Sequence, residues 1–240
     1  MSERDCCPVL ELRQYTLKPG QRNVLIELFD RHFVESQEAT GMTIVGQFRD
    51  RRRADRFVWV RGFADMQTRH RALEAFYEGP VWAEHKAAAN ATMVDVSDVC
   101  LLKPAGPETS FHLDITDRPK PGEVRGSAIV AVGIHRLQQA ADAGVLSQFQ
   151  QHVVPALRRE RVFIQSVFVT ESAPNTFARL PVREGEHLLV WFGTAQNGEP
   201  PTEPRLLAAT AGLSAHADGP ASFLELEPTP RSLLGRDKRP

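Results

Sequence analysis

Charged and aromatic side chains alternate with apolar ones near the start of the chain. In the segment at residues 9–17, Glu11, Arg13 and Tyr15 occupy every second position. Successive side chains of a β-strand point to opposite faces, so these three residues share one face if the segment is a strand. An arginine beside a phenol can bind an anion or orient a polar group of a substrate.

The segment RFVWVRGF, at residues 56–63, has the same alternation. If the two segments form neighbouring strands, two arginines and two aromatic residues come together: Arg13, Tyr15, Trp59 and Arg61. Such a cluster suits an anionic or conjugated small molecule. The alternative is that Glu11 pairs with an arginine inside an interface between sheets, where the aromatic rings only pack.

Two histidines lie on the apolar faces of predicted helices. His32 belongs to a helix expected at residues 20–37, and His85 shares a face with Trp82 in a helix expected at residues 81–91. Imidazole titrates near neutral pH, so either residue could act as a general base. A packed core histidine with no chemical role is the alternative in both cases.

The candidate site therefore has two groups of residues. We expect catalysis from His85, Arg61 and Tyr15, and substrate binding by Arg13, Trp59, Trp82 and His32. The spacing of cysteines, histidines and carboxylates matches no metal site, and the chain has neither a Gly-x-Ser-x-Gly elbow nor a Gly-rich phosphate loop. We expect no metal and no cofactor held by such motifs.

The first half of the chain reads as strand, helix, strand, strand, helix, strand. Apolar periodicity, turn residues and caps predict these elements at residues 9–17, 20–37, 42–49, 56–63, 65–77 (continued at 81–91) and 93–102.

The same order recurs in the second half, where the first strand repeats the apolar positions of residues 9–17 at a shift of 120. The expected elements are at residues 128–137, 144–159, 162–171, 187–194, 205–213 and 221–227. A further segment, at residues 111–116, could add an edge strand. The charged residues are not repeated, since Ala131, Gly133 and Phe192 stand at the shifted positions. If only one half carries a site, we expect it to be the first.

A βαββαβ order is that of a ferredoxin-like α+β unit, whose helices cover one face of the sheet. The other face needs a partner, and two units in one chain supply it internally. We divide the chain into domains at residues 1–107 and 108–240, the second ending in a flexible tail that is rich in proline and charge.

Residues 9–105 resemble a NIPSNAP domain. The resemblance lies in the opening ELRQYTLKPG, the strand after an arginine-rich hairpin, the second helix with its aromatic residues and arginines, and the closing LLKP. It implies that the two ferredoxin-like units form an intramolecular dimeric α/β barrel. That fold is shared with small monooxygenases, decarboxylases and haem-binding proteins, and several NIPSNAP members are discussed as interaction proteins.

Three functions follow as expectations from these residues and this resemblance. The first is a small-molecule-binding protein that acts as a cofactor-independent enzyme of monooxygenase, isomerase or decarboxylase type, on a small hydrophobic or anionic substrate. The second is a haem protein, because haem-binding members of the fold take a histidine from a helix comparable to that of His85. The third is a non-catalytic interaction or scaffold protein.

The composition is that of a folded globular protein, with 42% hydrophobic and 25% charged residues. The net charge of −1 argues against a nucleic-acid partner. No apolar stretch reaches the ~18 residues of a membrane helix, and the N-terminus lacks an apolar signal segment. We expect a cytoplasmic protein whose partner is a small molecule and whose two-unit barrel could associate into a homo-oligomer.

Overall fold

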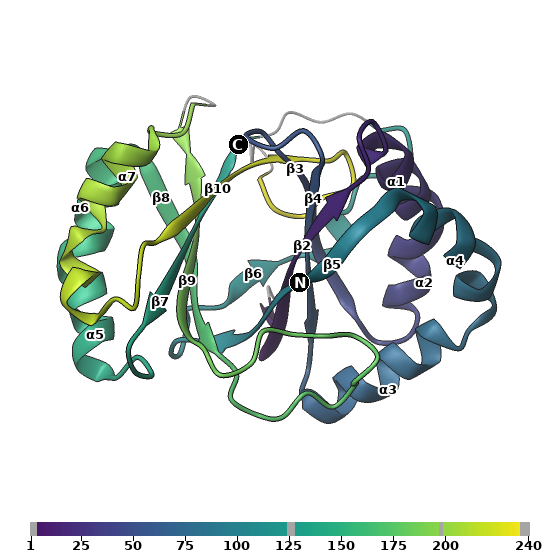
Figure 1. Ribbon diagram of the computed structural model, residues 1–240, viewed down its shortest axis with the longest axis horizontal. Coiled ribbons are helices and arrows are strands. Elements are labelled where there is room, and N and C mark those ends of the chain that lie inside the picture. Colours follow the sequence, from purple (N-terminus) through teal and green to yellow (C-terminus); the bar gives the residue numbers. More distant parts are fainter. Residues whose placement is uncertain (1–3, 124–127, 197–198, 236–240) are drawn as a thin grey trace.

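The computed structural model describes residues 4–123, 128–196 and 199–235 (Figure 1). Eight antiparallel strands close a barrel in the order β10-β3-β4-β2-β5-β8-β9-β7, with β10 also paired to β7. The helices of the first half cover one side of the barrel and those of the second half cover the opposite side (Figure 1). Among the described residues, no helix has the length and apolar character that crossing a membrane requires.

The first unit has the predicted order of elements. They are β2 (Val9–Leu17), α1 (Arg22–Leu28), the π-turn η1 (Phe29–Phe33), α2 (Val34–Glu38), β3 (Thr43–Asp50), β4 (Arg56–Phe63), α3 (Met66–Tyr77), α4 (Pro80–Thr92) and β5 (Met93–Pro104). Asp65 begins α3, because its carboxylate accepts a hydrogen bond from the backbone N–H of Thr68. Pro80 begins α4, where its missing N–H costs nothing.

The second unit repeats the order of the first. Its elements are β7 (Val130–Leu137), α5 (Ala143–Gln148), the π-turn η3 (Phe149–Val153), α6 (Val154–Arg159), β8 (Val162–Thr170), β9 (His187–Ala195), α7 (Glu203–Ala209), the 3₁₀ turn η5 (Ala211–His216) and β10 (Ser222–Pro228). The two π-turns lie 120 positions apart, so this irregularity is repeated with the fold. Pro155, which lacks an N–H, sits in the first turn of α6 directly after η3.

The two units share one barrel because the edge strands of each unit's sheet pair with the edge strands of the other. β5 of the first unit pairs with β8 of the second, and β10 pairs with β3. Side chains at alternate positions of all eight strands point inward, and they include Leu10, Val60, Val132 and Phe192. Among the described residues, these inward side chains form an apolar core in the barrel interior.

Residues 111–113 do not extend the barrel. β6 (Phe111–Leu113) instead pairs with β1 (Arg4–Cys6) in a separate two-stranded sheet, and the 3₁₀ turn η2 (Ile115–Asp117) follows it. Phe111 packs between Phe168 and Phe192, with both ring centroids 5.1 Å away. The segment between the units is therefore anchored by its aromatic residue.

The expectation of a flexible C-terminal tail is wrong for residues 229–235, while residues 236–240 lie outside the described part. The backbone N–H groups of Thr229 and Leu233 donate to the carbonyls of Gln47 and Val45. Arg231 donates to the carbonyl of Asp30 and pairs with Glu35. The proline and the charged residues suggested that this segment is mobile, but its leucines are buried against the first unit.

Leu234 tests this attachment, because it is 5% exposed and belongs to the barrel core. We expect Leu234→Ala to lower the free energy of unfolding by about 2–4 kcal/mol, measured by urea denaturation. The matched control, Leu207→Ala, changes a leucine that is 43% exposed and should alter stability by less than about 0.5 kcal/mol. Equal stabilities for the two variants would contradict the attachment.

Candidate functional site

The predicted cluster of charged and aromatic residues forms on the outer face of the first unit's sheet. β2 and β4 are neighbours, with Glu11 opposite Arg61 and Arg13 opposite Trp59. Trp59 and Tyr15 pack with helix residues such as Phe29 and not with the barrel core. Glu11 does pair with arginines, but the alternative that placed this pairing in an interface between sheets is wrong. The cluster lies between sheet and helices.

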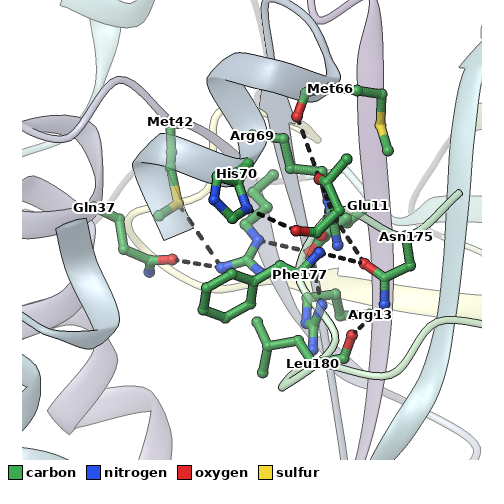
Figure 2. Close-up of polar contacts among 12 residues, drawn as sticks. Glu11, Arg13, Gln37, Met42, Met66, Arg69, His70, Asn175, Phe177 and Leu180 are labelled. Carbon is green, nitrogen blue, oxygen red and sulfur yellow. Dashed lines mark hydrogen bonds and ion pairs between the residues drawn. The ribbon is translucent and has the colours of Figure 1, made fainter. Parts of the chain in front are cut away.

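Glu11 is the centre of the cluster and is fully buried (Figure 2). Its Oε2 accepts hydrogen bonds from Arg13 Nη1 and Arg61 Nε, both at 2.7 Å. Its Oε1 accepts from Arg69 Nε, also at 2.7 Å. A third arginine, from α3, therefore joins the two from the sheet.

These four side chains carry a net charge of +2 in the protein interior, since one carboxylate faces three guanidinium groups. Burial alone would raise the pKa of Glu11, but the three arginines, with Arg61 the strongest, outweigh it and hold that pKa well below its usual range. Burial lowers the pKa of Arg69, although a guanidinium stays charged at physiological pH. An excess buried charge of this size is costly unless other groups compensate it.

Four buried donors of the cluster have no hydrogen-bond acceptor among the described residues: the Nη2 atoms of Arg13, Arg61 and Arg69, and the indole Nε1 of Trp59. Aromatic faces compensate part of the charge, because the guanidinium carbons of Arg61 and Arg13 lie 4.9 and 5.6 Å from the centroid of the Trp59 ring. The cluster still has more donors than acceptors, which is the polarity that an anion matches.

The remaining arginine donors fix the polar side chains beside them. Arg13 Nε donates to the hydroxyl oxygen of Tyr15 at 2.9 Å, and Arg61 Nη1 donates to Oε1 of Gln37 at 3.1 Å. Burial raises the pKa of Tyr15, so its hydroxyl keeps its proton. That proton is donated to no described residue and is free for a ligand.

Tyr15 and Gln37 also line a cavity between the sheet and the helices. Its volume is about 100 Å³, and aromatic side chains dominate its wall: Phe29, Phe33, Trp59, Phe76, Tyr77 and Trp82. Asn90, Met93, Val96 and Leu180 line it as well. The volume is closer to the ~150 Å³ of an apolar cavity that takes benzene than to the ~300 Å³ of a small drug site. The cavity suits one ring.

The sequence-predicted residues divide into two sets. Tyr15, Trp59 and Trp82 line the cavity, and Arg13 and Arg61 support its wall. His32 and His85 do not line it. Their rings stack on each other with centroids 3.8 Å apart, beside Phe33. Both histidines are half-buried, and their catalytic or binding role stays a prediction.

The residues present do not fit a haem. His85, the expected axial ligand, faces the ring of His32 and is not among the side chains that line the cavity. A space for one ring is also far smaller than a macrocycle built from four. Within the described residues, no group of three or more histidines, cysteines and carboxylates is placed to bind a metal ion.

The second unit keeps the framework of the site without its charges. Gly133 lies opposite Trp191, as Arg13 lies opposite Trp59, and Ala131 pairs with Gly193. Gly193 therefore takes the place of Arg61, and the assignment of that place to Phe192 is wrong by one residue. A one-residue slip moves a side chain to the other face of a strand, and Phe192 points into the barrel core.

Trp191 fills the space that an arginine occupies in the first unit. A Cβ atom on Gly133 would lie 2.2 Å from its ring. The indole Nε1 donates to Nε2 of His135 at 3.0 Å, and burial lowers the pKa of this histidine to about 4. His135, which is neutral at physiological pH, lines a second cavity of about 190 Å³ between β7 and the segment of α7 and η5. No charged cluster lies behind it in the described residues.

Sequence reasoning missed Arg69, Gln37 and the contacts from the second unit. Arg69 falls on the inner face of α3, three residues before Ala72 and four before Leu73, so its position on a buried helical stripe was available as a signal. Its Nη1 donates to Asn175 Oδ1 at 3.0 Å and to Thr176 Oγ1 at 3.2 Å. No sequence pattern brings these distant residues together.

Solved structures of the same architecture cover nearly the whole chain. A "putative monooxygenase" from Fusobacterium nucleatum subsp. nucleatum superposes with a TM-score of 0.58 at 10% identity, over 97% of each chain. One from Lactobacillus acidophilus NCFM gives 0.55 at 13% identity, over 96% of this chain and 98% of its own. An anthrone oxidase-like protein gives 0.53 at 12% identity, over 95% and 92%. The fold is the dimeric α/β barrel, built within one chain.

A family model matches the first unit. The NIPSNAP family model matches residues 10–106, which confirms the resemblance seen in the sequence for this part of the chain. A comparison with curated proteins finds no match.

Replacing Glu11 tests whether its carboxylate holds the three arginines. We expect Glu11→Gln to lower the free energy of unfolding at pH 7 by about 3–5 kcal/mol, because the guanidinium groups lose the one carboxylate that pairs with them among the described residues. Glu203→Gln is the control. It removes an exposed carboxylate that pairs with Arg52 at 2.7 Å, and it should cost less than about 1 kcal/mol.

The effect of Glu11→Gln depends on pH in a defined direction. Because folding lowers the pKa of Glu11, its stabilisation is present above its ordinary pKa of 4.5 and is lost as the pH falls through the folded-state value. The difference in stability between wild type and Glu11→Gln should therefore be full at pH 7 and shrink below about pH 4.5. Denaturation curves with a difference that grows on acidification would contradict this assignment.

Proposed function

We propose that the first unit of this chain binds a small aromatic molecule with an ionised oxygen, and that it acts on it as a cofactor-independent enzyme. The single observation behind this proposal is the contact of Arg13 Nε with the hydroxyl of Tyr15 at the wall of the aromatic cavity. This contact links a buried, positively charged cluster to a space that suits one ring.

Tyr15 is the residue through which the cluster would act on a ligand. Its oxygen accepts from Arg13, so its own O–H is polarised and can donate to an oxygen atom in the cavity. The unpaired indole N–H of Trp59 offers a second donor in the same wall. The three arginines behind them favour negative charge on the ligand, in the manner of a preorganised oxyanion site.

The lining also limits the chemistry. Among the described side chains that line the cavity, none is a carboxylate, imidazole or amine. Stabilisation of an ionised substrate oxygen is therefore better supported than abstraction of a carbon-bound proton by the protein. This argument favours a phenol or enol that ionises in the cavity as the substrate class.

Within the enzyme class we place oxidation by dioxygen first. The whole-chain structural neighbours bear the names of monooxygenases and of an anthrone oxidase-like protein. In an oxidation of this type, a ring C–H ortho or para to the ionised oxygen becomes C=O, and the phenol becomes a quinone. One atom of dioxygen enters the product, and the other leaves as water with the hydrogen of that C–H and the proton of the phenol.

Binding is tested with salicylate, which has one ring, a hydroxyl and a carboxylate. We expect a Kd below about 1 mM by isothermal titration calorimetry. Tyr15→Phe should weaken binding by about tenfold, because one hydrogen bond to a charged group is lost. Tyr77→Phe is the matched control: it also lines the cavity, but its hydroxyl makes no hydrogen bond to a described residue.

The neutral analogue 2-hydroxybenzyl alcohol keeps the ring and hydroxyl of salicylate but lacks its negative charge, so it measures how much the charge contributes to binding. It should bind at least about tenfold more weakly than salicylate. Equal binding of the two compounds, or equal losses in Tyr15→Phe and Tyr77→Phe, would reject the placement of the site. If no small molecule binds, the interaction-protein function becomes the better explanation.

Catalysis is tested separately with an oxygen electrode and a panel of single-ring hydroxyaromatic compounds. A true substrate should be consumed at least about tenfold more slowly by Tyr15→Phe than by wild type, because the donor to the ionised oxygen is missing. Tyr77→Phe should keep the wild-type rate. Oxygen uptake that is the same in all three proteins, or that persists in heat-treated protein, would contradict an enzymatic role of the site.

A further inference from the structure

The loop between β8 and β9 is much longer than its counterpart in the first unit. It spans residues 171–186, whereas residues 51–55 join β3 to β4. In Figure 1 it leaves the second unit as the green segment and passes beside α3 of the first. The family match ends at residue 106, so the loop lies wholly outside it.

An aromatic residue anchors the loop to the first unit. Phe177 is 6% exposed and stacks on Tyr77 of α3, with ring centroids 6.0 Å apart. The ring of His70 lies 6.1 Å away, and its Nδ1 is 2.6 Å from the carbonyl oxygen of Thr176. Because Tyr77 also lines the cavity, the anchor packs directly behind the cavity wall.

Asn175 connects the charged cluster to the loop (Figure 2). Its Oδ1 accepts from Arg69 Nη1 at 3.0 Å and from the backbone N–H of Phe177 at 3.1 Å. Its Nδ2 donates to the carbonyl of Leu180 at 2.9 Å. One side chain of the second unit thus fixes both an arginine bound to Glu11 and the backbone of Leu180.

Leu180 completes the cavity. It is the only residue of the second unit among the described side chains that line it, together with residues of β2, β4, β5 and the four helices. Its backbone is held from both sides, because its N–H donates to the carbonyl of Phe177 and its carbonyl accepts from Asn175. A loop fixed in this way can define the size of the space next to it.

We infer that residues 175–180 of the second unit determine which ring systems the first unit's site accepts, with Leu180 as the size-limiting wall and Asn175 as its positioning residue. This inference rests on the proposed function. It assigns the second unit a part in recognition, beyond closing the barrel. It also specifies the ligand as a single-ring aromatic anion and excludes fused rings of the same chemistry.

The test compares salicylate with 3-hydroxy-2-naphthoate, which keeps the hydroxyl and carboxylate and adds one fused ring. Wild type should prefer salicylate. Leu180→Ala should shift the ratio of the two dissociation constants toward the naphthoate by about tenfold or more, because the wall retreats by three carbon atoms. Asn175→Ala should shift the ratio in the same direction, since Leu180 loses its support.

Glu184→Ala is the matched control from the same loop. Glu184 is exposed and lies outside residues 175–180, so its removal should leave the ratio unchanged. A measurement on the wild type adds to this test: salicylate should slow amide hydrogen exchange at Phe177 and Leu180.

The outcomes separate the two proposals. If wild type binds salicylate but Leu180→Ala keeps the wild-type ratio, or exchange at residues 175–180 is unaffected by salicylate, the inference is wrong and the proposed site stands. If wild type binds neither compound, the proposed function fails and the inference fails with it. A variant that does not fold leaves the decision to the exchange measurement on the wild type.

Discussion

The first unit depends on one buried carboxylate that three guanidinium groups share. Glu11 accepts 2.7 Å hydrogen bonds from two strands and one helix, so it ties sheet and helix layers together while leaving a net positive charge between them. Replacing all four groups with apolar residues could give an equally stable core. A charge excess next to an aromatic cavity is therefore better explained by what the cavity binds than by stability.

Alternation and periodicity were sufficient to predict much of this arrangement. β4 has the bounds expected from sequence, and Arg13 meets Trp59 because both positions follow from a simple two-residue period. The outward direction of the cluster did not follow, because alternation defines two faces without saying which one the helices cover. The stacking of His32 on His85 was equally inaccessible, since it depends on how two helices pack.

The elements that escaped prediction share a physical cause. Residues 229–235 and the loop at residues 171–186 have no periodic apolar pattern, and each is held by a few specific contacts to distant parts of the chain. Asn175 and Arg69, 106 positions apart, illustrate this dependence. Local propensity carries no information about such contacts, so a segment that looks mobile in sequence can be the one that completes a cavity.

The pairing of edge strands between the two units has an evolutionary consequence. In a barrel made from two identical chains, every substitution appears twice, and a residue that suits one half must be tolerated in the other. Joining the halves covalently while β5 pairs with β8 and β10 with β3 keeps the barrel closed and removes that restriction. One half could then keep its arginines, while the other has Gly133 and Gly193 at the corresponding positions and a longer loop between β8 and β9.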